Sequence, residues 1–416
     1  MFQVSHWLDG SNIYGSTELE SSQLRGSDGL LKISGPEKNN LPSCSKFTED
    51  IDACDTCKAT TDRCFFAGDS RVNEQPNLIV MHTVFVREHN RLVQILSALN
   101  PGWDGERLFE EARRINVAQY QHLVYKEWLP IVLGNTMMRT FGLFPLSSGF
   151  STDYDDSFDP RINNEFAAAA FRFGHSLITG EYAIKTIRST PETFHLRDVF
   201  FKPMDLNTSD TFDGLVRGLA EEETRAWDSN FIPEIRNHLF ESSKNSGGLD
   251  LVAINVQRGR DHGIPGYSQY LEICGGRKIQ SWQDLGDVMA PEHIRKLETV
   301  YKSVEDVDLF VGGFLERSHE DALIGTVFKC IIGDQFARLK KGDRFFYDLG
   351  IDENIKFTET QLEEIRKVSF ARLLCENTQI GSIQPFPFKM PINQINSKRS
   401  CEELMSIKTN WNVFKE

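Results

Sequence analysis

The sequence predicts a mainly α-helical protein. Apolar residues recur at helical spacing over several long stretches, whereas strand-like alternation of apolar and polar residues is scarce and short. The intervening segments are rich in Gly, Asn and Asp, which favour loops. With 416 residues and 40% apolar composition the chain can bury a large core. Length alone allows one to three domains, and we expect a single domain over residues 1–416.

The first long predicted helix follows a turn at Gly68 and Asp69. Pro76 suits the first turn of a helix. Five apolar residues then recur on one stripe: Leu78, Met81, Phe85, Leu92 and Ile95. Arg71 and Glu74 therefore lie at the start of this helix. A guanidinium there can stabilise negative charge on a bound oxygen species, although an ordinary surface ion pair with Glu74 is the commoner arrangement.

A second long helix is predicted to begin at Asp104, a good N-cap residue, and to end before Pro130. Its apolar stripe comprises Leu108, Ala112, Ile115, Val117, Tyr120 and Val124. Further helices are predicted at residues 166–178, 221–228, 291–300, 323–339 and 360–374.

Charge and hydropathy exclude some classes of partner. The net charge of −14 argues against nucleic acid or an anionic membrane as a partner, because both favour basic patches. No run of 18 apolar residues is present, so we expect no membrane span. The segment after Met1 lacks the basic start and apolar core of a signal peptide.

Eight long segments carry a resemblance to a known family. They are WLDGSNIYGS from Trp7, CFFAGDSRVNEQP from Cys64, MHTVFVREHNRL from Met81, LNPGWDGERLFEEAR from Leu99, FRFGHSLI from Phe171, NVQRGRDHGIPGY from Asn255, DVDLFVGGFLE from Asp306 and GTVFKCIIGDQFARLKKGDRFFY from Gly325. Short motifs alone match by chance, but these occur in family order. The chain resembles the animal haem peroxidases of the peroxidase and cyclooxygenase superfamily, with invertebrate secreted peroxidases nearest. The resemblance implies many helices around a central haem pocket and very little strand.

The resemblance makes His175 the proximal ligand of haem iron and Asn255 the acceptor of its second NH. An amide acceptor leaves the imidazole neutral and the iron electron-poor, which favours a strong oxidant. Arg172 and Arg258 match residues that bind the haem propionates, and a guanidinium suits a carboxylate. Taken alone, a histidine in an alanine-rich helix is more often a core residue, and the arginines could form structural salt bridges.

On the opposite, distal side of the haem, Arg71 matches the distal arginine. Glu74 matches a glutamate that the family esterifies to a haem methyl, so a b-type haem with one ester link is implied as an option. Gln75 stands where the leukocyte enzyme has a methionine that forms a sulfonium link, which excludes that link here.

Ser5, Trp7, Asp9 and Ser11 match the calcium loop of the family. They offer two hydroxyls, one carboxylate and the Trp7 carbonyl. Calcium prefers about six to eight oxygens, so the site is incomplete, and a simple Asp and Ser turn is the alternative.

The chain is predicted to be N-terminally truncated relative to the family. In the family, a segment before the calcium loop supplies a distal histidine, a calcium-binding aspartate and a glutamine of the distal cavity, and we expect none of them here. We find no replacement for the distal histidine among the other histidines, which include His6, His82, His89, His122 and His262.

The eight cysteines indicate disulfides and an oxidising compartment. The resemblance implies three bridges, Cys54–Cys64, Cys274–Cys330 and Cys375–Cys401, with Cys44–Cys57 as a fourth guess. A CxxC redox or zinc motif at Cys54 and Cys57 is the weaker alternative, because no second motif accompanies it. A glycosylation sequon at Asn207 also fits an extracellular protein.

Two functions follow. The first is a haem peroxidase that uses hydrogen peroxide to oxidise halide, thiocyanate, phenolic or tyrosyl donors, with a part in hydrogen peroxide catabolism and the response to oxidative stress. The second is a non-catalytic secreted module for adhesion or matrix assembly. The proximal residues favour the first, whereas the missing distal segment favours the second, and we predict the peroxidase.

Overall fold

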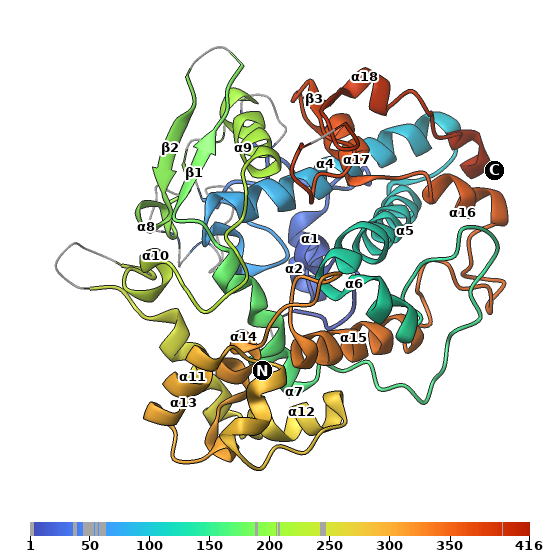
Figure 1. Ribbon diagram of the computed structural model, residues 1–416. Helices are drawn as coiled ribbons and strands as arrows, with labels where there is room; N and C mark the ends of the chain where they lie inside the picture. The colour runs from blue at the N-terminus through green and yellow to red at the C-terminus, as the bar shows by residue number, and fades with distance from the viewer. Residues whose placement is uncertain are drawn as a thin grey trace.

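The computed structural model describes residues 4–35, 40–44, 54, 57, 64–187, 190–204, 206, 209–241, 247–392 and 394–416. Helices dominate the described chain and strands are few and short (Figure 1). The predicted mainly α fold is therefore confirmed. The assignment of residues 1–416 to one domain stays a prediction.

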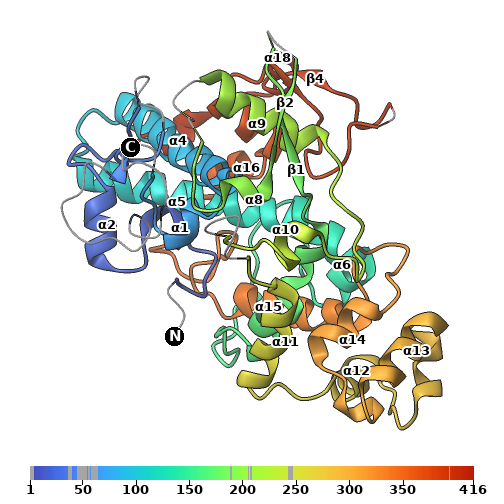
Figure 2. The ribbon, with the colours of Figure 1, turned by 90° about the vertical axis from the view of Figure 1, so that its left-hand side faces the viewer.

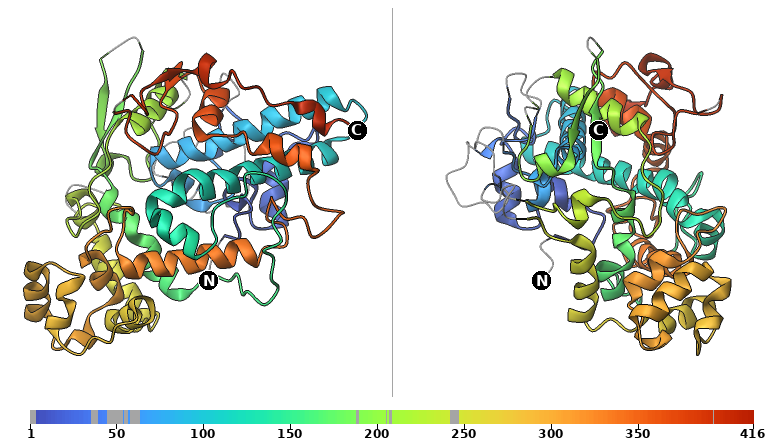
Figure 3. Two further views of the ribbon diagram at one scale, coloured as in Figure 1. Left: turned by 45° about the vertical axis from the view of Figure 1, so that its right-hand side comes forward. Right: turned by 60° about the vertical axis from the view of Figure 1, so that its left-hand side comes forward.

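Two long helices, α4 (Pro76–Leu99) and α5 (Gly105–Leu123), lie side by side in the middle of the molecule (Figures 1 and 3). The side chain of Gln75 accepts a hydrogen bond from the Asn77 N–H and so caps α4. Asp104 caps α5 as predicted, with its carboxylate accepting from the Arg107 N–H at 2.9 Å.

The expected end of α5 before Pro130 is wrong in detail. The chain passes from α5 into a π-helical turn, η3 (Val124–Trp128), and then into α6 (Leu129–Thr140). Pro130 lies in the first turn of α6, where a missing N–H costs little.

Many of the other elements are short. They include α1 (Ser11–Tyr14), α2 (Glu18–Leu24), η2 (Ser70–Asn73), α8 (Leu196–Val199), α9 (Ser209–Glu221), α10 (Pro233–Arg236), α16 (Glu359–Ile365), α17 (Phe370–Asn377), α18 (Cys401–Leu404) and η7 (Trp411–Phe414). Two antiparallel strand pairs lie among these elements: β1 (Glu181–Ile184) with β2 (Glu192–His195), and β3 (Ser382–Ile383) with β4 (Arg399–Ser400).

A second group of helices projects away from α4 and α5 (Figures 2 and 3). It comprises α11 (Leu251–Asp261), α12 (Tyr267–Gly275), η5 (Trp282–Asp287), α13 (Pro291–Val300), η6 (Val304–Asp306) and α14 (Leu309–Leu315). This group packs onto α15 (Thr326–Lys341), α7 (Asn164–Ala168) and η4 (Ala170–Leu177). One continuous apolar core joins it to α5 and α6.

The other predicted helices were found with three differences. Residues 222–228 are not helical, because the apolar residues that face the core lie earlier, in α9. The predicted helix at 166–178 divides into α7 and the 3₁₀ helix η4 at Ala169, whose φ of −137° is not helical. The predicted helix at 360–374 divides into α16 and α17, and Ser369 caps the second.

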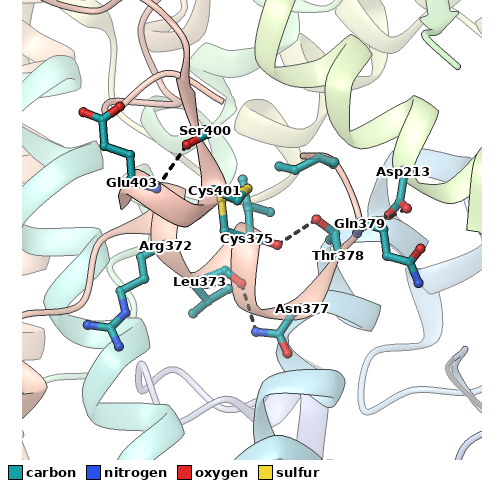
Figure 4. Close-up of a disulfide and its surroundings, with 12 residues drawn as sticks. Asp213, Arg372, Leu373, Cys375, Asn377, Thr378, Gln379, Ser400, Cys401 and Glu403 are labelled. Carbon is teal, nitrogen blue, oxygen red and sulfur yellow. Dashed lines mark hydrogen bonds between the residues drawn. A yellow bond between two sulfur atoms is a disulfide. The ribbon is translucent and has the colours of Figure 1, made fainter. Parts of the chain in front are cut away.

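Two of the four disulfides agree with the expected pairs, Cys274–Cys330 and Cys375–Cys401, and Figure 4 shows the latter beside the Ser400 cap of α18. The other two expected pairs are wrong. The structure joins Cys44 to Cys54 and Cys57 to Cys64, so neither Cys54–Cys64 nor Cys44–Cys57 forms. Four cysteines allow three pairings, and the spacing along the chain does not choose among them. All eight cysteines are paired, which removes the CxxC metal alternative.

Two further expectations concern secretion and membranes. The sequon at Asn207 and Thr208 lies outside the described residues. Within the described part of the chain, no helix is both long enough and apolar enough to cross a bilayer.

Candidate functional site

His175 lies in the 3₁₀ helix η4, which packs between α7 and α15. Its neighbours Phe173 and Ser176 point into the core, at 5% and 1% exposure, and so fix the direction of the short helix. The His175 ring is half-buried. The fold therefore presents this imidazole at the edge of the core on a firmly packed element.

Asn255 meets His175 from α11, as the resemblance implied. The N-cap Asp250 holds the start of α11 by accepting from the N–H groups of Val252 and Ala253. The Asn255 side chain is fully buried, and its Nδ2 lies 2.9 Å from Nδ1 of His175. A buried carboxamide beside the imidazole restricts the orientation of the ring.

The polarity of this contact is the reverse of the one expected. Arg172 donates a hydrogen bond from Nη1 to Oδ1 of Asn255, and a guanidinium has no acceptor atom. Oδ1 is therefore turned to Arg172, and the amide NH₂ of Asn255 is turned to His175. In this arrangement Nδ1 of His175 is the acceptor and the ring proton lies on Nε2.

The electrostatic environment keeps His175 neutral. Burial, and then the positive charge of Arg172, lower the pKa of His175 to about 4. Burial, and then Arg258, lower the pKa of Arg172. In the described part of the chain, neither Arg172 nor the exposed Arg258 forms an ion pair with a carboxylate.

These residues fit a haem in chemical type. A neutral imidazole can bind iron, and two guanidinium groups without acidic partners can receive propionates. Phe171, next to Arg172, adds an apolar ring that is 43% exposed. Iron binding at Nε2 would require the ring proton to move to Nδ1 and the Asn255 carboxamide to turn over.

Arg71 and Glu74 lie together just before α4, as predicted, but Arg71 pairs with a different carboxylate. Arg71 donates from Nε and Nη2 to Asp69 at 2.9 and 2.6 Å. The Arg71 side chain is 64% exposed, whereas that of Asp69 is 10% exposed. Asp69 was missed as a site residue, although its position two residues before Arg71 was a usable signal.

Glu74 remains on the same turn, with its N–H donating to the Arg71 carbonyl at 2.9 Å. Burial raises the pKa of Glu74, and the nearby Arg71 opposes this effect. Burial also acts to raise the pKa of Asp69, but hydrogen bonds from Arg71 outweigh it and leave that pKa below its usual value. Arg71 therefore stabilises Asp69 as the carboxylate.

The proposed calcium residues form local turns. Asp9 accepts from the Ser11 N–H at 2.9 Å, and the Ser5 hydroxyl accepts from the Trp7 N–H at 3.2 Å. Within the described residues, no three His, Cys, Asp or Glu side chains gather closely enough to hold a metal ion. Calcium binding by Ser5, Trp7, Asp9 and Ser11 stays a prediction.

Gly68 joins this loop to the turn that carries Arg71. A Cβ atom at Gly68 would lie 2.1 Å from the Ser11 carbonyl oxygen and 2.4 Å from the Gly15 nitrogen. Only glycine allows this approach, so the loop at residues 9–15 and the Arg71 turn are packed as one unit.

A comparison with protein families decides the identity. The family model described as animal haem peroxidase matches residues 1–388. The chain belongs to the animal haem peroxidase family. Within this family the expected cofactor is haem, in agreement with the residues around His175.

Curated relatives from insects support the assignment. The chain is 40% identical over 416 residues to a Drosophila melanogaster protein named Peroxidase, covering 98% of this chain and 59% of that protein. It is also 40% identical over 390 residues to the Drosophila Chorion peroxidase, covering 92% of this chain and 47% of that protein. The chain thus spans about half the length of these relatives.

Solved structures agree on the fold. Peroxidase A from Dictyostelium discoideum superposes with a TM-score of 0.78 at 33% identity, covering 92% of this chain and 70% of the other. A fatty acid α-dioxygenase from Arabidopsis thaliana superposes with a TM-score of 0.69 at 22% identity, covering 88% and 60%, and shows the fold alone.

Proposed function

We propose that this chain is the haem-binding body of a peroxidase that uses hydrogen peroxide to oxidise small donors. The observation that carries the proposal is the buried contact of Asn255 with His175, supported by Arg172. This arrangement offers a neutral imidazole, held by its contact with Asn255, beside two arginines for which the described residues provide no carboxylate partner. Membership of the family and the names of the relatives support the same interpretation.

The haem would supply the redox chemistry, and the chain would hold and tune it. His175 would bind the iron, Asn255 would set the ring orientation, and Arg172 and Arg258 would receive the propionates. Glu74, partly buried and with a raised pKa, would be the residue available for an ester link. Arg71 would stabilise negative charge on the peroxide-derived oxygen on the distal side.

Arg71 cannot carry out proton transfer, because a guanidinium stays protonated at working pH. A general base contributes roughly 10²- to 10⁴-fold to such a step. Proton transfer to and from peroxide therefore requires a group other than Arg71.

We propose halide, thiocyanate, phenols or tyrosyl groups as donors and an extracellular location. The four disulfides fit an oxidising compartment. Relatives named Chorion peroxidase and Peroxidasin are among the matches, and their names carry the extracellular proposal only as an analogy.

A non-catalytic module for adhesion or matrix assembly is the second candidate. One observation favours it: Arg71 is mostly exposed and is engaged by Asp69 instead of facing a closed cavity. Such a module would keep the helical body without needing rapid peroxide turnover.

Absorption spectra of the haem-reconstituted chain separate the two candidates. The peroxidase predicts a Soret band that is lost in His175→Ala and that shifts when hydrogen peroxide is added. A matched variant, His195→Ala, changes an exposed histidine on β2 and should leave the band intact. A Soret band of equal intensity in the wild type and His175→Ala, or one that does not shift when hydrogen peroxide is added, would support the non-catalytic module.

A further inference from the structure

Tyr347 and His122 form a buried hydrogen-bonded pair outside the site described above. The Tyr347 hydroxyl lies 2.7 Å from Nδ1 of His122, and the two residues are 4% and 2% exposed. Gln121, next to His122, accepts a hydrogen bond from the Tyr347 N–H at 3.0 Å and donates to the Leu8 carbonyl at 2.9 Å. The phenol of Tyr347 and the imidazole of His122 are thus held in a fixed relative position.

This geometry suits oxidation of the phenol. A phenol that loses an electron becomes a very strong acid, so oxidation is easy only where a base can take the proton. Burial, followed by the charges of Lys126 and Arg366, lowers the pKa of His122 to about 3, so its imidazole is neutral at neutral pH. A neutral imidazole with its proton on Nε2 has a lone pair on Nδ1 directed at the Tyr347 hydroxyl.

Tyr125 provides an internal comparison. Its ring is also fully buried, but its hydroxyl donates at 2.7 Å to the backbone carbonyl of Phe336. An amide carbonyl accepts a hydrogen bond but is a very poor proton acceptor. Of these two buried tyrosines, only Tyr347 has a partner that can accept its proton.

A continuous set of aromatic rings leads from the His175 helix to this pair. Phe173, two residues before His175, lies 6.3 Å from Trp128 between ring centroids. The later contacts are Trp128–Phe336 at 6.0 Å, Phe336–Tyr125 at 5.7 Å, Tyr125–Phe346 at 5.1 Å and Phe346–Tyr347 at 5.3 Å. Electron tunnelling weakens steeply with distance, so rings in contact shorten each step.

The helices explain why these rings meet. Tyr125 and Trp128 both belong to the π-helical turn η3, and π-helical turns are frequently found at functional sites. Phe336 comes from α15, which packs against α6 and η4 (Figure 1). Phe173, Tyr125, Trp128 and Phe336 therefore lie on packed helices, whereas Phe346 and Tyr347 lie on the turns that follow α15.

The far end of the ring set reaches a cavity. Tyr347 and Phe346 line a cavity of about 840 Å³, together with Trp7 and Tyr154. This volume is ample for a phenol or a tyrosine side chain, and aromatic walls favour an aromatic guest. Arg113, Arg114, Glu110 and Asp352 add both signs of charge to the walls.

We propose that Tyr347 is a redox-active residue that carries oxidising equivalents from the haem to a phenolic donor bound in this cavity, with His122 as its proton acceptor. The proposal rests on the proposed function, because the oxidant is the peroxide-oxidised haem. It adds a second place of oxidation for donors too large to approach the haem.

The electrons and protons balance. Tyr347 loses one electron along the ring set to the oxidised haem, and its phenolic proton moves to Nδ1 of His122, which leaves a neutral tyrosyl radical and an imidazolium. A phenolic donor then returns one electron to Tyr347, His122 returns the proton, and the donor releases its own proton and becomes a phenoxyl radical. Two donors supply the two electrons and two protons that convert one hydrogen peroxide into two waters.

Freeze-quench electron paramagnetic resonance of the haem-reconstituted chain tests the proposal. After peroxide addition we expect a tyrosyl radical signal that narrows when tyrosine is ring-deuterated and disappears in Tyr347→Phe. His122→Asn keeps a hydrogen-bond acceptor but cannot take the proton, so the signal should fall at least roughly tenfold. The control Tyr182→Phe changes a tyrosine that lies outside the ring set, stacked on Phe194, and should keep the signal.

Donor oxidation gives the second readout. Oxidation of free tyrosine and of a tyrosine-bearing folded protein should fall in Tyr347→Phe, whereas oxidation of iodide at the haem should not. If only the folded protein is affected, the donor is a tyrosine of another polypeptide, which would support the proposal in that narrower form.

Failure of the proposed function and failure of the Tyr347 proposal give different results. A wild-type Soret band that does not respond to peroxide would overturn the proposed function and the Tyr347 proposal with it. A normal Soret response together with an unchanged radical signal in Tyr347→Phe would overturn the Tyr347 proposal alone. A haem-free measurement, the ¹⁵N spectrum of His122, should show a bare Nδ1 at neutral pH that shifts in Tyr347→Phe, and a protonated Nδ1 would also overturn it.

Discussion

The two candidate halves of the haem site are built in different ways. On the proximal side, His175 and Asn255 come from separate helices 80 residues apart in the chain and meet only because η4 and α11 are packed together. On the distal side, Asp69, Arg71 and Glu74 share one turn, and Arg71 is mostly exposed. The proximal half therefore depends on the whole fold, whereas the distal half needs only local structure.

The largest expected effect comes from the proximal half. His175→Ala should abolish specific haem binding, because no other residue of the proximal set can bind iron. His175 is half-buried, so the variant should fold, and circular dichroism provides that check. Titration with haem measures the result, and retained tight binding would show that another residue holds the iron.

Substitutions of Asn255 test whether this residue holds Arg172 and His175 in place and tunes the iron. Asn255→Ala leaves Arg172 and His175 without their buried partner and should cost about 1–3 kcal/mol of unfolding free energy. Asn255→Asp should instead make the imidazole more anionic and lower the iron(III)/iron(II) reduction potential. Spectroelectrochemistry checks the second variant, and a potential that rises in Asn255→Asp would contradict the role of Asn255.

The pH dependence follows from the lowered pKa of His175. Burial, with Arg172, lowers this pKa to about 4 from an ordinary value near 6.5. Between about pH 6.5 and pH 4 the unfolded state binds a proton at His175 more readily than the folded state does. The free energy of unfolding is therefore unaffected by this group above about pH 6.5 and decreases as pH falls from 6.5 towards 4. Haem affinity should stay constant as the pH is lowered to about 4 and should decline below that pH. Haem release beginning near pH 6.5 would contradict this environment.

A smaller effect concerns the proton of His175. Because Arg172 orients the Asn255 carboxamide, ¹⁵N spectra of the haem-free chain at neutral pH should show His175 protonated at Nε2. Arg172→Leu frees the carboxamide and should shift the ring towards protonation at Nδ1. Arg258→Leu is the control, since Arg258 is exposed and the hydrogen bonds of the Asn255 side chain are made to Arg172 and His175. Protonation at Nδ1 in the wild type would overturn the arrangement.

The smallest effect is expected on the distal side. Asp69→Asn keeps the acceptor that caps η2 but removes the charge that holds Arg71. The Arg71 side chain is 64% exposed, so the unfolding free energy should change by less than about 1 kcal/mol. Asp159→Asn removes the carboxylate of a similarly spaced, exposed pair with Arg161 and serves as the control. A loss several times larger in Asp69→Asn alone would show that the distal turn depends on the wider fold as strongly as the proximal half does.

Sequence reasoning recovered what local pattern encodes. The Asp104 cap, the proline in the first turn of α4 and the apolar stripes of α4 and α5 are local features, so both helices were predictable. The Gln75 cap of α4 was not predicted. The place of His175 beside Asn255 came from resemblance, because nothing in the spacing along the chain reveals the contact. The Arg172 hydrogen bond that turns the carboxamide depends on packing, and no pattern signals it.

The wrong and missed predictions concern features that depend on tertiary packing. Cys44, Cys54, Cys57 and Cys64 lie within one short segment, so tertiary geometry alone chooses their partners. The π-helical turn after α5 keeps helical periodicity, and Pro130 therefore indicated an end instead of a new first turn. The Tyr347–His122 pair joins residues 225 apart and had no signal in the sequence.

The most direct test of the central claim is the resonance Raman spectrum of the ferrous, haem-reconstituted chain. The claim is that His175, oriented by Asn255, holds the iron. It predicts an iron–histidine stretching band that is present in the wild type, absent in His175→Ala and shifted to higher frequency in Asn255→Asp. A band that is unchanged in His175→Ala, or absent from the wild type, would contradict it.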